Sequence, residues 1–225
     1  MKNVKYFKLI LLLVLVPFFT TLGGTPGCST KRAQIKGTTA PMEWVCDKEA
    51  DEALKAHDYI VSIKLHEQFI KDSPSNGLAF YHLGYAYGQM GNHEKEITLY
   101  EKAISLGFIG SNIFFNLGMA YGELDRIEEA IDTFKRGLAS DRENFDNHFG
   151  LALAYQRNSS FKLAEEEFLE SLEIKPEDID ARFYLGMMYL DMGKYRDARE
   201  QARKILETDK HNEMAIEILN RINGR

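Results

Sequence analysis

The residues that could carry chemistry are few and widely spaced along the chain. There are two cysteines and six histidines; the cysteines form no CxxC pair, and no two histidines have the HExxH spacing. A GxSxG motif, a phosphate-binding P-loop and a Cys/His pair at a helix start are also missing from the sequence. The glutamates at 165–167 fit a solvated helix face. We therefore expect no catalytic residue, no metal ligand, no cofactor and no enzymatic activity.

The first 28 residues follow the pattern of an export signal. Lys2, Lys5 and Lys8 precede an unbroken apolar run at 9–19, which a Thr, Gly and Pro segment follows. Eleven residues make only about 16 Å of helix, short of the roughly 30 Å core of a bilayer. The pattern predicts a secretory signal peptide over 1–28. An uncleaved anchor, which would leave Lys2 in the mature protein and the remainder facing the cytosol, stays open.

Cys28 ends this segment at a position suited to lipid attachment. The four residues 25–28 (TPGC) resemble the lipobox of bacterial lipoproteins, although that family favours Leu where Thr25 stands. The resemblance implies lipidation of Cys28 and anchoring on the periplasmic side of a bacterial membrane, with Ser29 compatible with the outer membrane. Soluble export without lipid is the alternative, and Cys28 could then pair with Cys46 in a disulfide. Otherwise we expect Cys46 to be a small buried apolar residue.

Charge divides the chain into two parts. The net charge is −6, and residues 1–42 hold six basic residues and no acid, so residues 43–225 carry −12. Residues 29–42 are expected to be a polar basic linker. The acidic field of the remainder repels phosphate backbones, which argues against nucleic acid as a partner, whereas a basic protein would be attracted at low salt. A hydrophobic content of 44% is ample for a buried core.

A period of 34 residues organises the chain beyond the linker. Four columns of similar residues follow it: Leu83, Leu117, Leu151 and Leu185; Gly84, Gly118, Ala152 and Gly186; Tyr87, Tyr121, Tyr155 and Tyr189; and Tyr100, Phe134, Phe168 and Ala202. Each unit is predicted to form two amphipathic helices. We expect Gly118 to face the small Ala130 across its hairpin, so that the two backbones approach closely. No hairpin can bury its apolar face alone, so the hairpins must stack.

These columns resemble the tetratricopeptide repeat (TPR) family, most closely at 116–138 (NLGMAYGELDRIEEAIDTFKRGL) and 184–198 (YLGMMYLDMGKYRDA). The resemblance implies an all-α, right-handed superhelical solenoid of antiparallel helix pairs. The units expected are a degenerate repeat at 43–76, full repeats at 77–110, 111–144, 145–178 and 179–212, and a capping helix at 213–225.

The resemblance also implies that the first helices of the repeats line a concave groove for a protein or peptide. Two apolar columns would line it: Tyr81, Phe115, Phe149 and Phe183, and one turn further Tyr85, Met119, Leu153 and Met187. The Asn, Lys and Arg side chains with which related proteins clamp a carboxylate are missing there, so we expect an apolar segment of a partner rather than a small molecule. Glu123 and Asp191, at the groove ends, would orient a basic partner. Alternatively, these apolar side chains pack on neighbouring hairpins.

The sequence therefore predicts a non-enzymatic protein-binding scaffold in the cell envelope, which assists the assembly or localisation of a membrane protein complex. Its layout is similar to that of the TPR lipoproteins of type IV pilus assembly, the pilotins. Two alternatives remain. One is a soluble exported binding or regulatory subunit, and the other is a membrane-anchored adaptor that faces the cytosol.

Overall fold

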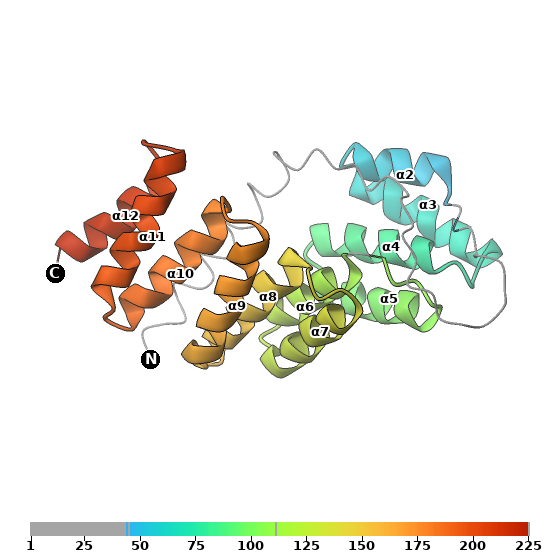
Figure 1. Ribbon diagram of the computed structural model, residues 1–225. Helices are drawn as coiled ribbons and strands as arrows, with labels where there is room; N and C mark the ends of the chain where they lie inside the picture. Colours follow the sequence, from blue (N-terminus) through green and yellow to red (C-terminus); the bar gives the residue numbers. More distant parts are fainter. Residues whose placement is uncertain (1–43, 45, 111, 225) are drawn as a thin grey trace. The chain divides into compact units, whose positions relative to one another are not determined.

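The computed structural model describes residues 44, 46–110 and 112–224, which belong to one compact unit, Thr39–Arg225. The predicted signal peptide, Cys28 and the linker lie outside the described residues. The described part contains eleven α-helices and no strand (Figure 1), which confirms the predicted all-α repeat fold. The helices are α2 (Lys48–Lys55), α3 (Tyr59–Asp72), α4 (Gly77–Gln89), α5 (His93–Ser105), α6 (Ile113–Glu123), α7 (Ile127–Ser140), α8 (Phe145–Arg157), α9 (Phe161–Ile174), α10 (Ile179–Asp191), α11 (Tyr195–Thr208) and α12 (Glu213–Asn223).

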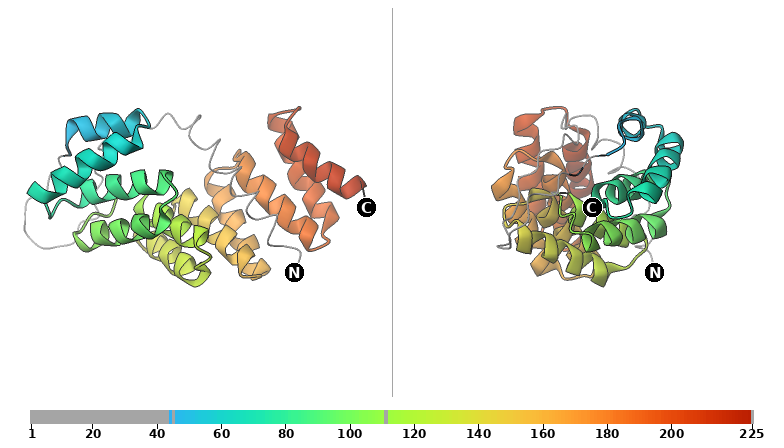
Figure 2. Two further views of the ribbon diagram at one scale, coloured as in Figure 1. Left: turned by 180° about the vertical axis from the view of Figure 1, so that it is seen from behind. Right: turned by 90° about the vertical axis from the view of Figure 1, so that its right-hand side faces the viewer.

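Successive helices pair into hairpins, and the hairpins follow one another in chain order (Figures 1 and 2). The first helices are α2, α4, α6, α8 and α10, and the second helices are α3, α5, α7, α9 and α11. Each first helix packs on its own second helix, and from α4 onward also on the second helix of the preceding hairpin, while α12 packs on α10 and α11. None of the helices described is both long and apolar enough to cross a bilayer.

The turn inside each hairpin contains one residue with a left-handed backbone. These residues are His57, Gly91, Asp125, Ser159 and Gly193, with φ between 58° and 74°, and they are spaced by 34 residues. Gly91 and Gly193 adopt this conformation without a steric cost, whereas the three other residues carry a Cβ that disfavours it. The first hairpin, α2 and α3, therefore turns in the same way as the others although its sequence is degenerate.

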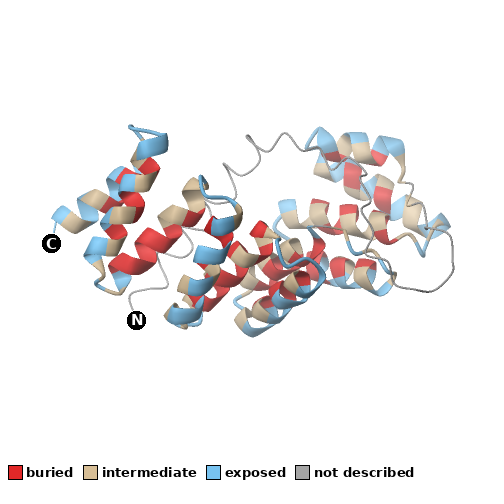
Figure 3. Cartoon of the chain, viewed as in Figure 1, coloured by how far each residue is buried: buried red, intermediate tan, exposed pale blue. Residues whose placement is uncertain are grey.

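The core follows the predicted columns (Figure 3). The exposed fractions of Leu83, Leu117, Leu151 and Leu185 lie between 0% and 2%, and those of Tyr100, Phe134, Phe168 and Ala202 between 0% and 1%. One contact differs from expectation, because the nearest atoms to a Cβ built on Gly118 belong to the Phe134 ring rather than to Ala130. Helical side chains lean toward the N-terminus of their helix, so the space beside Gly118 is filled by a residue one turn further along α7.

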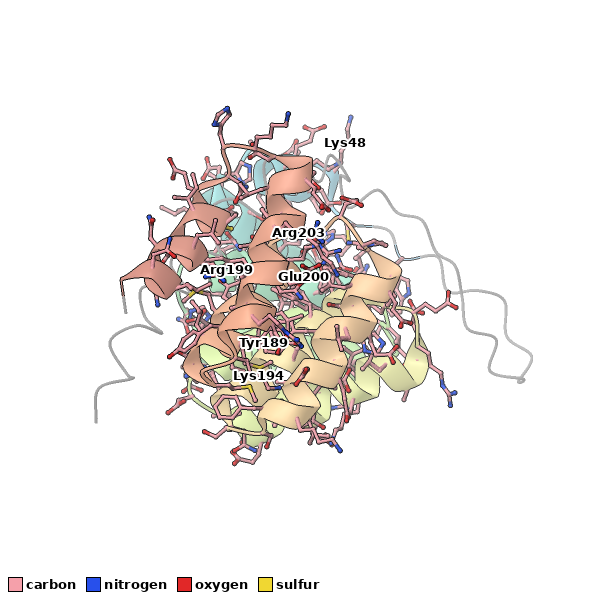
Figure 4. All side chains as sticks on the ribbon, turned by 60° about the vertical axis from the view of Figure 1, so that its left-hand side comes forward. Lys48, Tyr189, Lys194, Arg199, Glu200 and Arg203 are labelled. Carbon is pink, nitrogen blue, oxygen red and sulfur yellow. The ribbon has the colours of Figure 1, made fainter. Side chains whose placement is uncertain are left out.

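Three members of the tyrosine column link their hairpin to the one before it. Tyr87, Tyr121 and Tyr189 donate hydrogen bonds of 2.6, 2.6 and 2.8 Å to Glu67, Glu101 and Glu165, each on the preceding second helix. Lys194, which lies next to Tyr189 in Figure 4, donates to the same Glu165 carboxylate at 2.9 Å. The fourth tyrosine lacks this acceptor: Lys135 lies opposite Tyr155, with Nζ 5.5 Å from the centre of its ring.

Candidate partner-binding face

The first predicted groove column contributes mainly to packing. Phe149 is only 1% exposed, and its ring contacts those of Phe168 and Tyr184, with centroids 6.1 and 5.7 Å away. Phe115 lies against Phe134, and Phe183 against Tyr184. These rings fill the space within and between hairpins, so little of the buried Phe149 side chain is available to a partner in this conformation.

Tyr81 belongs to the same column and has a different environment. Its hydroxyl accepts a hydrogen bond of 3.0 Å from the Asn116 amide on the next first helix. Its ring lies beside those of Tyr100 and Phe108, at centroid distances of 5.5 and 5.2 Å. Burial raises the pKa of Tyr81 to about 12, so this side chain is a neutral link between α4 and α6.

The second predicted column is more accessible. Tyr85, Met119 and Leu153 are half-buried on α4, α6 and α8, whereas Met187 on α10 is only 7% exposed. They occupy equivalent positions on consecutive first helices, so they form a row of apolar side chains that is partly open to solvent. This row carries no amide and no cation.

Two carboxyl groups lie on the same helix faces as this row. Asp146 and Asp180 precede Leu153 and Met187 by seven residues, which is close to two helical turns. Burial raises the pKa of Asp180 to about 6, with the neighbouring carboxylate of Asp178 acting in the same direction. Burial also raises the pKa of Asp146, against the attraction of Lys175. Among the described residues, neither carboxyl takes part in an ion pair within 4.0 Å.

Glu123 extends this acidic character to α6. It is half-buried, its Oε1 atom has no hydrogen-bond partner within the described part of the chain, and burial raises its pKa. Asp191, the second acid expected at the groove ends, is exposed at the end of α10. We call the set formed by Tyr85, Met119, Leu153, Met187, Glu123, Asp146 and Asp180 the apolar-acidic face. It offers apolar contact beside carboxyl groups that are partly removed from water and whose pKa values are raised by burial.

Asp146 and Asp180 were not among the predicted site residues, although the repeat pattern contained a signal for them. They are separated by 34 residues and therefore hold the same position in consecutive repeats. Their significance depends on partial burial, which a repeat pattern does not report.

Two surface hollows lie elsewhere. One, of about 250 Å³, is lined by Leu169, Leu172, Glu173, Arg182, Gln201 and Lys204. The other, of about 460 Å³, is lined by Arg142, Glu143, Glu170, Glu173 and Ile174. Neither includes a predicted groove residue.

The repeat assignment agrees with known families. Three family models, each described as tetratricopeptide repeat, match residues 78–106, 115–179 and 167–200. Together with the helix pairs described above, they show that this chain contains tetratricopeptide repeats in an all-α fold. No curated protein matches the sequence significantly.

Solved structures with the same arrangement include MamA, which is 24% identical, with a TM-score of 0.68, 74% of this chain covered and 97% of that one. A MamA fragment from Desulfovibrio magneticus RS-1 is 16% identical, with a TM-score of 0.68 and coverage of 72% and 92%. YrrB, named as a TPR protein with an unusual peptide-binding site, is 17% identical, with a TM-score of 0.64 and coverage of 75% and 87%. At such identities the likeness shows the fold.

Proposed function

We propose that this protein is a non-enzymatic scaffold in the cell envelope that binds an apolar, basic segment of a partner protein through the apolar-acidic face. The partly buried carboxyl of Asp180, two helical turns from Met187 on the same face of α10, carries this proposal. A carboxyl whose pKa is raised by burial gains most from a cation that arrives with a partner. The peptide-binding site named for YrrB supports the same use of the fold.

Each part of the face has a distinct role in this proposal. Met119 and Leu153 supply apolar contact, and the flexible Met119 side chain can adapt to the shape of the bound segment. Asp146 and Asp180 attract Lys or Arg side chains of the partner and fix the direction in which the segment lies. Assembly or localisation of a membrane complex is the process in which such a scaffold would act.

The placement in the envelope is supported by the residue pattern at 1–28. Mass spectrometry of the mature N-terminus tests it, because an acylated Cys28 as the first residue supports a lipid-anchored scaffold. An unmodified, cleaved N-terminus would point to the soluble exported subunit. Persistence of Lys2 would point to the anchored adaptor that faces the cytosol.

Site-specific crosslinking tests the binding face. A photoreactive residue in place of Leu153, on α8, should capture a defined partner in intact cells. The same residue in place of Leu163, a 43% exposed leucine on α9, serves as the matched control. Partner capture from position 163 that equals or exceeds capture from 153 would move the site away from the apolar-acidic face.

Charge variants test the second half of the proposal. The pair Asp146→Asn and Asp180→Asn should weaken capture from position 153 about tenfold, as expected when a partner cation loses its counter-charge. The pair Glu170→Gln and Glu173→Gln removes the same charge from exposed positions on α9 and should leave capture unchanged. Equal effects of the two pairs would show that only the overall negative field matters.

A further inference from the structure

Three potential metal ligands at the start of the described array lie close together, and a fourth, His66, lies beside one of them. Cys46 precedes α2, Asp51 lies on α2, His66 on α3 and His82 on α4. The Cys46 sulfur, an Asp51 carboxylate oxygen and a His82 ring nitrogen are all within 4.8 Å of one another. Asp51 Oδ1 is 2.7 Å from His82 Nδ1 and 3.4 Å from His66 Nε2. The Asp51 carboxylate is therefore the centre of the group.

His66 has an unusual environment in this group. Its side chain is completely buried, and its Nδ1 atom is 2.9 Å from the Ser62 carbonyl oxygen, which can only accept a hydrogen bond. Nδ1 must therefore carry a proton, and in a neutral imidazole this leaves a lone pair on Nε2. Nε2 has no hydrogen-bond partner among the residues described, and it faces the Asp51 carboxylate.

A buried nitrogen lone pair that faces the half-buried Asp51 carboxylate is unfavourable unless a proton or another positive charge lies between them. A metal ion supplies such a charge. Histidine ligands of metals commonly donate the other ring N–H to a backbone carbonyl, which is the arrangement that Ser62 gives to His66.

The ligand types and spacing indicate which ion. Thiolate, imidazole and carboxylate together are ligands that Zn²⁺ accepts in a tetrahedral site. With bonds of about 2.0 to 2.3 Å, neighbouring ligand atoms in a tetrahedron lie about 3.3 to 3.7 Å apart. The 3.4 Å distance from His66 to Asp51 matches this spacing, and the 2.7 Å distance from His82 to Asp51 would lengthen by less than about 1 Å. The set of ligand atoms within 4.8 Å of one another comprises Cys46, Asp51 and His82, so His66 would move toward the other ligands when the ion binds. We propose that Cys46, Asp51, His66 and His82 form a zinc-binding site.

The repeat columns explain what the site replaces. His66 occupies the position that Tyr100, Phe134 and Phe168 fill in later repeats, and Asp51 occupies the position of Tyr85. At these two positions the first hairpin therefore has the proposed metal ligands, where later repeats have mostly apolar side chains. Its first helix, α2, has eight residues, of which Ala50 and Leu54 are buried. A metal that joins α2, α3 and α4 would stabilise this end of the repeat array, where the described residues include no preceding hairpin.

Metal titration of the full chain tests the proposal. The protein is purified in detergent under reducing conditions, freed of metal with a chelator and titrated with Co²⁺, then with Zn²⁺. We expect one equivalent of Co²⁺ to bind with a thiolate-to-cobalt charge-transfer band, Zn²⁺ to displace it, and either metal to raise Tm. Absence of a one-to-one complex, or a complex without the charge-transfer band, would overturn the assignment.

Variants identify the ligands. His66→Gln and Asp51→Asn should each weaken Co²⁺ binding at least tenfold, whereas His57→Gln, an exposed histidine of the same hairpin, should bind as the unmodified chain does. If His66→Gln fails to fold by circular dichroism, Cys46→Ser at a half-buried position must still abolish the charge-transfer band. Unchanged binding by folded His66→Gln would show that His66 interacts with Asp51 as a protonated side chain and not through a metal.

Discussion

The ring of Phe134 lies directly against Gly118, so that a Cβ built on this glycine would be 2.5 Å from Phe134 Cε1. The same ring contacts the place where a side chain of Gly150 would be, on the first helix of the next hairpin. One aromatic side chain on α7 is thereby enclosed by glycines from α6 and α8. Its position requires that both glycines lack a side chain.

Gly118→Ala should lower the free energy of unfolding by about 1 to 3 kcal/mol, because the added methyl group overlaps a fully buried ring. Chemical denaturation monitored by circular dichroism measures the change. Gly122→Ala, one turn later on α6, is the control, because the nearest atom to a Cβ built on Gly122 is 3.9 Å away. Alanine there should stabilise the helix by about 0.5 to 1 kcal/mol. Similar losses in both variants would contradict the packing role of Gly118.

Tyr121→Phe should lower stability by about 1 kcal/mol, because it removes the hydrogen bond to Glu101 that joins α5 and α6. Tyr155→Phe is the matched control, since Lys135 stands where a glutamate would accept a hydrogen bond from the tyrosine hydroxyl. We expect this second change to cost less than about 0.5 kcal/mol. Thermal unfolding of both variants beside the parent chain distinguishes them, and equal effects would show that the tyrosine–glutamate link adds nothing to stability.

Ser159→Gly should raise stability by about 1 kcal/mol, because Ser159 adopts φ 58°, which disfavours residues with a Cβ. The preceding residue gives the control. Asn158 has φ −75°, so Asn158→Gly brings no conformational relief and increases the freedom of the unfolded chain. Denaturation midpoints that move together in the two variants would contradict this account of the turn.

His148 should make stability depend on pH. Its Nδ1 is 2.7 Å from a Glu167 oxygen and its Nε2 is 2.9 Å from the Arg142 carbonyl oxygen, so both ring nitrogens face acceptors. The hydrogen bond to Glu167 raises the pKa of His148 above 6.5, and the charge of Glu170 acts in the same direction. Protonated His148 therefore contributes fully below about pH 6.5, and its contribution is lost as the pH rises through the folded-state value.

Denaturation from pH 5.5 to 8.5 checks this prediction. The loss of stability with rising pH should be smaller in His148→Gln than in the parent chain, whereas His211→Gln, at an exposed position outside the helices, should follow the parent. Identical pH profiles for His148→Gln and the parent would rule out a contribution from this ion pair.

The repeat columns predicted the fold because an apolar residue that recurs every 34 residues indicates a position that is buried in the same way in each hairpin. Leu83, Leu117, Leu151 and Leu185 are all buried where the period placed them. The contact of Gly118 was not predicted correctly, since it depends on the direction in which Phe134 leaves its helix.

The candidate sites were less predictable. The columns marked the first helices but did not show that Phe149 is enclosed while Leu153 remains partly open, because burial depends on the neighbouring hairpins. A search for local metal motifs could not detect Asp51, His66 and His82, which come together only when three helices pack. The signal for Asp51 and His66 was the presence of ionisable residues in columns that are apolar elsewhere in the array, whereas the column of His82 gave no such signal.

Lys135 stands at the position that Glu67 and Glu101 hold in earlier repeats, so no tyrosine–glutamate hydrogen bond is described between the hairpins α6/α7 and α8/α9. An ion pair links these two hairpins. Arg157 on α8 donates to the Gly122 carbonyl and pairs with Asp125 at 2.7 Å, and the Asp125 side chain is 80% exposed. Dissolved ions screen such an exposed pair more than a part-buried hydrogen bond. We therefore expect concentrated electrolyte to weaken the Arg157–Asp125 pair more than the hydrogen bonds from Tyr87 and Tyr121 that link other neighbouring hairpins.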